Sequence, residues 1–214
     1  MKAMKLLALT VMTVMGIEAS AQLTKELDEW TRFEISFDAQ KIKYEGSNYE
    51  ADGISPKGAA IAIMHGVSLT NSIPLFLDLG GRITWTHNSE SYTGGKSKFT
   101  NANIAIPVEA AYKFSFANSP KVKIVPFFGP NFKFNFIARS KWCPYEGDDV
   151  KSNLFKEENG DAKIFQVGLN LGVGVHLGNF FVGYNFQPDI SSFEKSGDDK
   201  VKTKNNYISI GFNF

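Results

Sequence analysis

The chain has 214 residues, with 23 basic and 22 acidic side chains and a formal net charge of +1. This balance leaves no basic surplus for nucleic acid, and a hydrophobic share of 43% excludes a disordered chain. A single cysteine excludes an internal disulfide framework, and a mean hydropathy of −0.16 argues against a bundle of membrane-spanning helices. Nineteen Phe and nineteen Gly suit a β-protein that meets lipid.

The first 21 residues have the pattern of a secretory signal peptide. Two lysines within Met1–Lys5 precede the apolar run Leu6–Ile17, and the small residues Ala19–Ala21 follow it. A membrane anchor would need about 20 apolar residues, which is more than this run supplies. We therefore expect a signal peptide at 1–21, a short periplasmic segment at 22–29 and a barrel domain at 30–214.

From Trp30 onward, apolar residues alternate with polar residues or glycine. Along Phe165–Leu177 every odd position is apolar, and every even position is glycine, an amide or histidine. The same alternation continues through Phe180–Gln187 and Tyr207–Phe214, and it recurs near residues 30–40, 58–69, 74–88, 103–116 and 122–138. A period of two is typical of β-strands with two unlike faces, so the sequence predicts eight strands.

The connections between these segments alternate between short and long. Tight turns are expected at 70–72, 117–121 and 178–179, and long polar loops at 41–56, 89–102, 140–162 and 192–202. Short turns at one end and long loops at the other describe an all-β, eight-stranded antiparallel up-and-down transmembrane β-barrel. We expect it in the outer membrane, with both termini in the periplasm.

A soluble, lipocalin-like barrel would show the same alternation, but three features argue against it. The polar face is rich in glycine and amides, as suits a narrow packed lumen. Aromatic residues such as Trp85, Phe134 and Phe136 fall near strand ends on the apolar face, where interfacial girdles lie. The last strand ends like an outer-membrane assembly signal, with these residues on its apolar face: Ile208, Ile210, Phe212 and Phe214.

Several short motifs carry a family resemblance. They are Ile104–Val108, the Tyr112-Lys113-Phe114 triplet, Val125–Pro130, Gly168–Gly174, Phe180–Val182 and Asn205–Phe214. Together they resemble the outer membrane β-barrel family of Bacteroidota that includes PorT. The resemblance implies an integral outer-membrane protein and, for the PorT branch, a part in type IX protein secretion. For most relatives it implies no known chemistry.

Charged residues recur on the face that we assign to the lumen. They are Arg32, Glu34, Asp38, Asp78, Arg82, Glu109, Lys113, Lys123 and Lys133. Buried charges must be paired, and one register would place Asp78 opposite Lys113 and Arg82 opposite Glu109. Because eight strands leave an interior that side chains just fill, we expect a plugged lumen rather than a selectivity ring for ions.

His87 and Ser89 form a His-x-Ser motif on the apolar-face parity, with Glu90 next to it. The motif resembles that of outer-membrane lipid A deacylases, in which imidazole and hydroxyl would act as base and nucleophile. It lacks a clear acid at the same height on a neighbouring strand, so an interfacial histidine is the simpler interpretation.

The sequence therefore predicts a non-enzymatic protein that acts through its extracellular loops, chiefly 41–56 and 140–162, or as an envelope or secretion assembly component. The alternatives are a small porin-like diffusion channel and the lipid A deacylase. Expected partners are outer-membrane lipid and lipopolysaccharide, the barrel assembly machinery during insertion, and an envelope or surface protein. We expect a monomer with no cofactor, no metal site and no nucleic-acid partner.

Overall fold

The computed structural model describes residues 23–24, 29–45, 50–116, 119–155, 162–194 and 200–214. The expected signal peptide at 1–21 lies outside these residues. No helix in the described part of the chain has the length and apolarity needed to cross a membrane. The strands are β1 (Leu23–Thr24), β2 (Trp30–Glu45), β3 (Glu50–Asp52), β4 (Lys57–Ser68), β5 (Leu75–Tyr92), β6 (Gly95–Tyr112), β7 (Phe114–Phe116), β8 (Ser119–Pro144), β9 (Val150–Asn153), β10 (Phe165–Leu177), β11 (Phe180–Pro188) and β12 (Lys200–Asn213).

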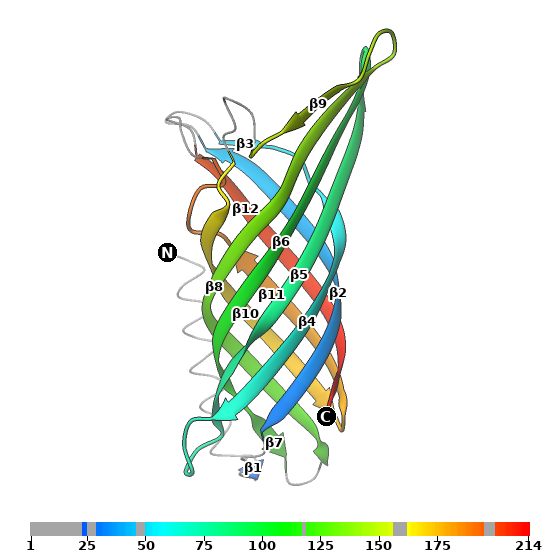
Figure 1. Cartoon of the computed structure of the whole chain (residues 1–214). Coiled ribbons are helices and arrows are strands. Elements are labelled where there is room, and N and C mark those ends of the chain that lie inside the picture. Colours follow the sequence, from blue (N-terminus) through cyan, green and yellow to red (C-terminus); the bar gives the residue numbers. More distant parts are fainter. Residues whose placement is uncertain (1–22, 25–28, 46–49, 117–118, 156–161, 195–199) are drawn as a thin grey trace.

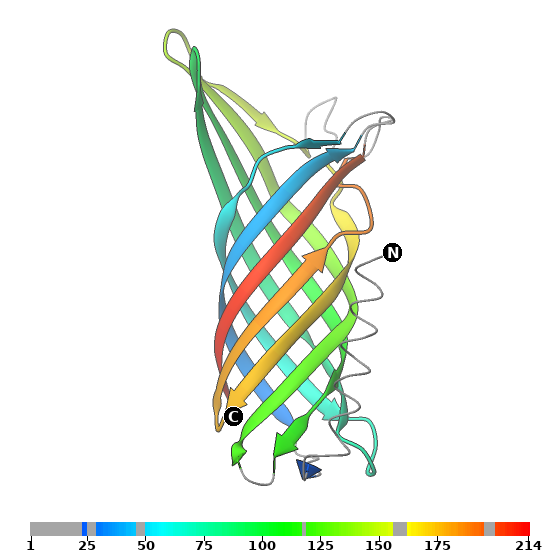
Figure 2. The same cartoon turned by 180° about the vertical axis from the view of Figure 1, so that it is seen from behind.

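Eight of these strands close into a ring (Figures 1 and 2). Each pairs antiparallel with its neighbours in the order β2, β4, β5, β6, β8, β10, β11 and β12, and β12 pairs with β2 to close the ring. The short strands β1, β3, β7 and β9 extend the sheet at its ends. The predicted all-β, antiparallel up-and-down barrel of eight strands is thereby confirmed.

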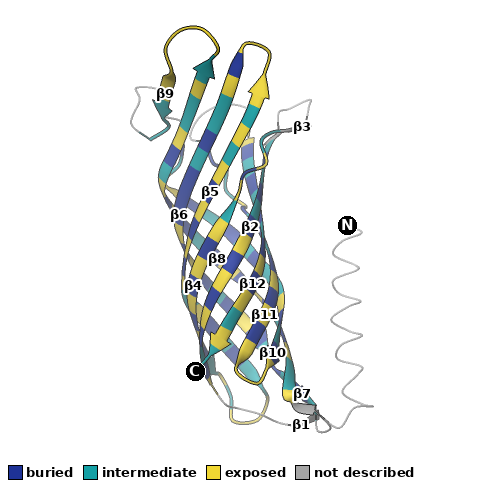
Figure 3. Ribbon diagram, turned by 90° about the vertical axis from the view of Figure 1, so that its right-hand side faces the viewer, coloured by how far each residue is buried: buried dark blue, intermediate teal, exposed yellow. Residues whose placement is uncertain are grey.

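The two faces of each strand differ as the alternation predicts (Figure 3). On β2, for example, Arg32, Glu34 and Ser36 are buried, whereas Phe33 and Ile35 are exposed on the outside of the ring. A soluble protein buries its apolar side chains, but this barrel turns them outward and encloses its polar side chains. The apolar outer surface therefore requires an apolar surrounding.

Three strands continue well past the rim of the ring. β5 and β6 pair as far as Tyr92 and Gly95, and β8 follows β6 to Pro144. Figures 1 and 3 show them as an extension beyond the barrel, joined at one side by β9. We call this extension, residues 88–101, 138–144 and 150–153, the projecting sheet. We call the rim from which it rises the distal rim, and the opposite rim, which holds Trp30 and Phe214, the proximal rim.

The projecting sheet corrects the prediction of a long loop at 89–102. That stretch is instead the tip of a hairpin, with Thr93 and Gly94 as a two-residue turn and Gly94 at a φ of +97°. Its sequence resembles a loop because a sheet beyond the rim contacts solvent on both faces and needs no apolar alternation. The expected loop at 140–162 likewise begins with paired residues of β8 and contains β9.

A register shift sets the direction of side chains on the upper part of β8. Asn103 faces Asn135, but its neighbour Ala102 faces Ile137, so Phe136 is an extra residue on β8. A β-bulge of this kind exchanges the two faces of the strand beyond it. Above the bulge, odd-numbered residues such as Arg139 lie on the outer side.

Candidate functional site

The centre of the barrel holds a charge network around Arg32. Its Nε donates to Oε1 of Glu34 at 2.6 Å, and its Nη2 donates to Oδ2 of Asp78 at 3.0 Å. The Nη2 of Arg82 donates to the other oxygen of Glu34 at 3.4 Å. All four side chains are buried, so each charge depends on these partners rather than on water.

The register between β5 and β6 differs from the predicted one. Asp78 lies opposite Glu109, not Lys113, and Arg82 lies opposite Ala105, not Glu109. The two-residue turn at Thr93–Gly94 sets this register, which places the partner on β6 four residues away from the predicted one. Asp78 obtains its cation from β2 across the interior, in the form of Arg32, so the predicted pairing was wrong.

A second network joins the middle of β8 to the residue that follows β11 and to the first half of β12. Nζ of Lys133 donates to both carboxylate oxygens of Asp189, at 2.7 and 3.0 Å, and to the side-chain oxygen of Asn205 at 3.2 Å. Asn205 in turn donates to Asp38 at 2.7 Å, and the hydroxyl of Thr203 donates to Asp189. Sequence reasoning missed Asp189 because it placed the end of the strand at Gln187. Extending the alternation by two residues would have found it.

The other predicted lumen charges also lie inside or at the mouth of the barrel. Glu109 is buried and accepts a hydrogen bond from Asn170, which accepts one from Gln187 at 2.6 Å. Lys113 is buried, with its Nζ 4.6 Å from the centre of the Phe76 ring. Lys123 is half-buried toward the proximal rim, opposite His176 on β10. With Asp189 included, the described residues named here contribute five bases and five acids to the interior, so their formal charges balance.

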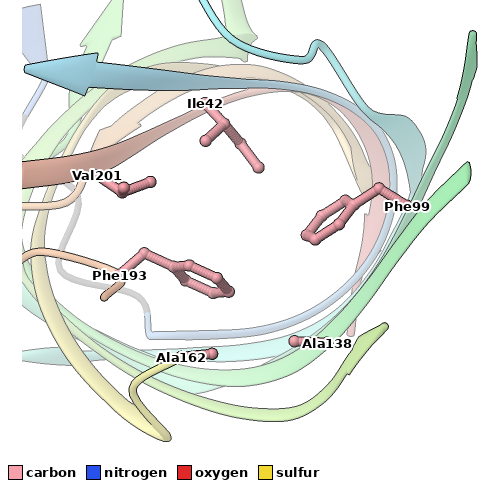
Figure 4. Close-up of a cluster of buried hydrophobic side chains, with 6 residues drawn as sticks. All are labelled: Ile42, Phe99, Ala138, Ala162, Phe193 and Val201. Carbon is pink, nitrogen blue, oxygen red and sulfur yellow. The ribbon is translucent and has the colours of Figure 1, made fainter. Parts of the chain in front are cut away.

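Apolar clusters lie at both ends of this polar interior. The distal cluster closes the mouth, with side chains from the barrel wall and from the loops pointing inward (Figure 4). Its members are Ile42, Phe99, Ala138, Ala162, Phe193 and Val201. The proximal cluster is Trp30, Phe76, Ala111, Val125 and Phe127. The interior is therefore filled by side chains in three layers: apolar, charged and apolar.

The His-x-Ser motif lies on the outside of β5, where its parity placed it. His87 and Ser89 are exposed, and Nδ1 of His87 is 3.0 Å from the hydroxyl of Thr100 on β6. Glu90 points to the other face, where it accepts hydrogen bonds from Asn88 and Tyr92. The neighbouring acid is therefore engaged elsewhere and does not orient the imidazole.

The projecting sheet presents apolar side chains on one of its faces. Tyr92 and Trp142 contact each other with ring centres 6.3 Å apart, and Val150 lies opposite Trp142 on β9. These three residues and the adjacent Tyr145 are among the exposed large hydrophobic residues, with Tyr145 71% exposed. Aromatic residues exposed above the rim have no part in closing the barrel. We call Tyr92, Trp142 and Val150 the aromatic face.

The predicted assembly signal is on the outer side of the last strand. Ile208, Ile210, Phe212 and Phe214 are all exposed there, and Phe212 contacts Phe180 of β11 edge-on. Among the described residues, no group of three or more His, Cys, Asp or Glu side chains could hold a metal ion.

The family comparison gives a match over nearly the whole chain. The model described as "Outer membrane protein beta-barrel domain" matches residues 7–214. No significant match was found among curated proteins.

Solved structures with similar folds come from other outer-membrane proteins. The attachment invasion locus protein Ail of Yersinia pestis, in complex with the heparin analogue sucrose octasulfate, is 13% identical, with a TM-score of 0.46 over 86% of this chain and 99% of Ail. Neisserial surface protein A is 18% identical, with a TM-score of 0.46 over 85% and 97% of the two chains. The N-terminal barrel domain of Pseudomonas aeruginosa OprF is 15% identical, with a TM-score of 0.30 over 85% and 97%. Identities this low say nothing of a shared activity.

Proposed function

This chain belongs to the outer membrane protein β-barrel domain family, and from that premise we propose that it is a non-enzymatic outer-membrane protein that binds a protein partner through its projecting sheet. The distal rim would then face the cell exterior and the proximal rim the periplasm. The observation that carries the proposal is the aromatic face, because exposed apolar side chains above the lipid-facing band are typical of interaction surfaces.

Two further observations support a contact role. The sheet is held rigidly, because its strands are continuous with barrel strands, and recognition residues are commonly presented by a rigid scaffold. A β-sheet also keeps Tyr92, Trp142 and Val150 on one side, so they form a patch rather than scattered positions. Of the two predicted contact loops, 140–162 therefore contains part of a sheet, formed by β8 and β9, that has a defined face.

Photo-crosslinking tests this proposal. A photoreactive amino acid at Val150 reports on the aromatic face, and one at Lys151 reports on the opposite face of the same strand. In native outer membranes we expect a discrete crosslinked product from position 150 and none from position 151. The double variant Tyr92→Ser, Trp142→Ser should lose that product by more than about tenfold, since aromatic anchors dominate most interfaces.

The identity of the crosslinked protein then separates the two forms of the proposal. An envelope protein indicates an assembly component, as the likeness to the PorT branch would suggest, and a protein from outside the cell indicates a surface receptor or adhesin. Identical products from positions 150 and 151, or a product that persists in the double variant, would show that the aromatic face is not the contact surface. Each variant should first be shown to be folded, which for a β-barrel is seen as a difference in gel migration between unboiled and boiled samples.

The rival function, a small diffusion channel, makes a different prediction. The distal cluster closes the mouth and the charge network lies in the middle of the lumen, so we expect these side chains to block the passage of water and ions. In a planar lipid bilayer we expect no discrete conductance steps from the purified protein. A porin inserted under the same conditions is the positive control. Reproducible steps from this protein that vanish on heat unfolding would favour the channel.

A further inference from the structure

One carboxylate lies beside the aromatic face. Glu90 has the same parity as Tyr92 on β5, and its carboxylate accepts hydrogen bonds from the Tyr92 hydroxyl and from Nδ2 of Asn88, the latter at 2.8 Å. Across the sheet, Glu90 lies opposite Ser97 of β6, which lies opposite Trp142 of β8. Glu90 and the aromatic face therefore form one continuous surface on the same side of the projecting sheet.

The aromatic rings of this surface lie close to the backbone of β6. Gly95 lies opposite Tyr92, and a Cβ added at Gly95 would be 2.7 Å from the ring of Trp142, so the indole covers this glycine. The Tyr92 ring is next to the indole, with the ring centres 6.3 Å apart and the planes tilted by 43°. The result is a low aromatic surface that is bordered, on the Tyr92 side, by the Glu90 carboxylate.

The two faces of the projecting sheet differ in charge. On the aromatic side, Glu90 is the one charged side chain among the described residues of the sheet, and none of the described basic side chains forms an ion pair with it. Hydrogen bonds from Tyr92 and Asn88 lower the pKa of the Glu90 carboxyl below its usual value, so it is ionised at neutral pH. The basic residues of the sheet have the opposite parity: Lys96, Lys98, Arg139, Lys141 and Lys151.

A partner that covers the aromatic face must also cover this negative charge. The carboxylate of Glu90 is bonded to the hydroxyl of Tyr92, so a surface that buries the ring removes water from the carboxylate as well. Burial of an ionised carboxylate without a cation is strongly unfavourable. The two hydrogen bonds that Glu90 accepts leave about two further positions at which a carboxylate can accept. The partner is therefore expected to supply a cation with hydrogen-bond donors.

We propose that the partner places an arginine side chain on the rings of Tyr92 and Trp142, with its guanidinium against the Glu90 carboxylate. A guanidinium is planar and weakly hydrated, stacks on aromatic rings and donates two parallel hydrogen bonds to a carboxylate, so it matches both parts of this surface. A lysine ammonium is compact and strongly hydrated, so it matches the rings less well. The inference rests on the proposed function, because it assigns the chemistry of the partner at the same aromatic face.

An isosteric substitution at Glu90 tests the proposal. Glu90→Gln removes the negative charge and keeps an oxygen that can accept from the Tyr92 hydroxyl. With the photoreactive amino acid at Val150 in native outer membranes, we expect this variant to give at least about fivefold less crosslinked product, because the cation of the partner is left unpaired. Glu146→Gln, which removes one charge from the exposed turn between β8 and β9, is the matched control and should keep the product.

Both variants should show the gel migration of the folded barrel. An undiminished product from the Glu90→Gln variant would overturn the proposal. An equal loss in the Glu146→Gln variant would also overturn it, because the effect would then come from overall charge and not from this carboxylate.

A small competitor identifies the cation. N-acetyl-arginine amide at about 50 mM should reduce the product from the wild type by at least about half, because a single contact of this kind has a dissociation constant in the millimolar range. N-acetyl-citrulline amide has nearly the same shape without the charge, and potassium chloride at the same concentration matches the ionic strength. Neither should reduce the product, and N-acetyl-lysine amide should reduce it less. An effect of any of these three that equals that of the arginine compound would overturn the assignment of an arginine.

An exchange of charges completes the design. Mass spectrometry of the product from position 150 gives the contact segment of the partner, and each arginine in it is changed to glutamate in turn. We expect Glu90→Arg to abolish the product and one of the partner changes to restore it in that background. A contact segment without arginine, or failure of every exchange, would overturn the proposal.

The two proposals fail in different ways. Absence of any product from position 150 in the wild type would remove the proposed function and, with it, this inference. A product that does not depend on Glu90 would leave the proposed function in place and overturn the arginine contact alone.

Discussion

Replacing Arg32 by alanine is expected to lower the free energy of unfolding by about 3 to 5 kcal/mol, because it leaves the buried Asp78 without its cation and Glu34 with Arg82 alone. Arg32 contacts both Glu34 and Asp78, and Asp78 already lies opposite Glu109, so the change leaves acids facing one another in the centre of the barrel. The measurement is urea unfolding of the protein folded into lipid vesicles.

Two further variants test whether the loss of stability comes from the Arg32 contacts. Arg139→Ala removes an exposed arginine from the outer side of β8 and should change stability by no more than about 0.5 kcal/mol. The double variant Arg32→Ala, Asp78→Ala should lose less than the sum of the two single changes, because the second removes a charge that the first left unpaired. Strictly additive losses would mean that the two residues do not depend on each other.

Phe181→Ala is the second change with a large expected effect, a loss of about 3 to 5 kcal/mol in the same assay. Its ring fills the interior against Gly174 and Gly183, where an added Cβ would overlap it. The guanidinium of Arg32 also lies over this ring, 4.0 Å from its centre. The alanine variant therefore leaves a cavity and loosens the central charge network at once.

The neighbouring residue provides the matched control. Phe180 has the same side chain, but it lies outside the ring, is 66% exposed and contacts Phe212 edge-on. Phe180→Ala should therefore cost clearly less than Phe181→Ala. An equal or greater loss from Phe180→Ala would mean that the inward and outward faces of β11 are assigned the wrong way round.

The outward and inward faces could be predicted from the sequence because successive side chains of a strand point to opposite faces. The alternation of apolar and polar residues therefore shows which face each residue occupies. The prediction of Phe165–Leu177 as a strand matches β10 residue for residue. Register is different. A shift of four residues along a strand, like any even shift, keeps every side chain on its own face, so alternation cannot detect it. The partners of Asp78 and Arg82 were therefore wrong even though both residues face the lumen, because what fixes them is the turn at Thr93–Gly94.

The projecting sheet could not be predicted from the sequence, for a related reason. Alternation arises where one face of a strand meets an apolar environment and the other does not. Between Asn88 and Asn101 much of the hairpin is past that environment, and its polar sequence is that of a loop. The aromatic face depends in addition on the bulge at Phe136, which exchanges the faces of β8 and brings Trp142 to the same side as Tyr92.

The pairing of β2 with β12 also bears on the order in which the chain assembles. Ser36 and Ser209 share a hydrogen bond at 2.8 Å, and Asp38 accepts one from Asn205, so the first and last ring strands satisfy each other's polar groups. Until the last strand arrives, Asp38 and the Lys133–Asp189 pair lack Asn205. A partly folded barrel therefore holds charged side chains without all of their hydrogen-bond partners until β12 is in place. This favours closure of the ring as a late, all-or-none event in the membrane over insertion strand by strand.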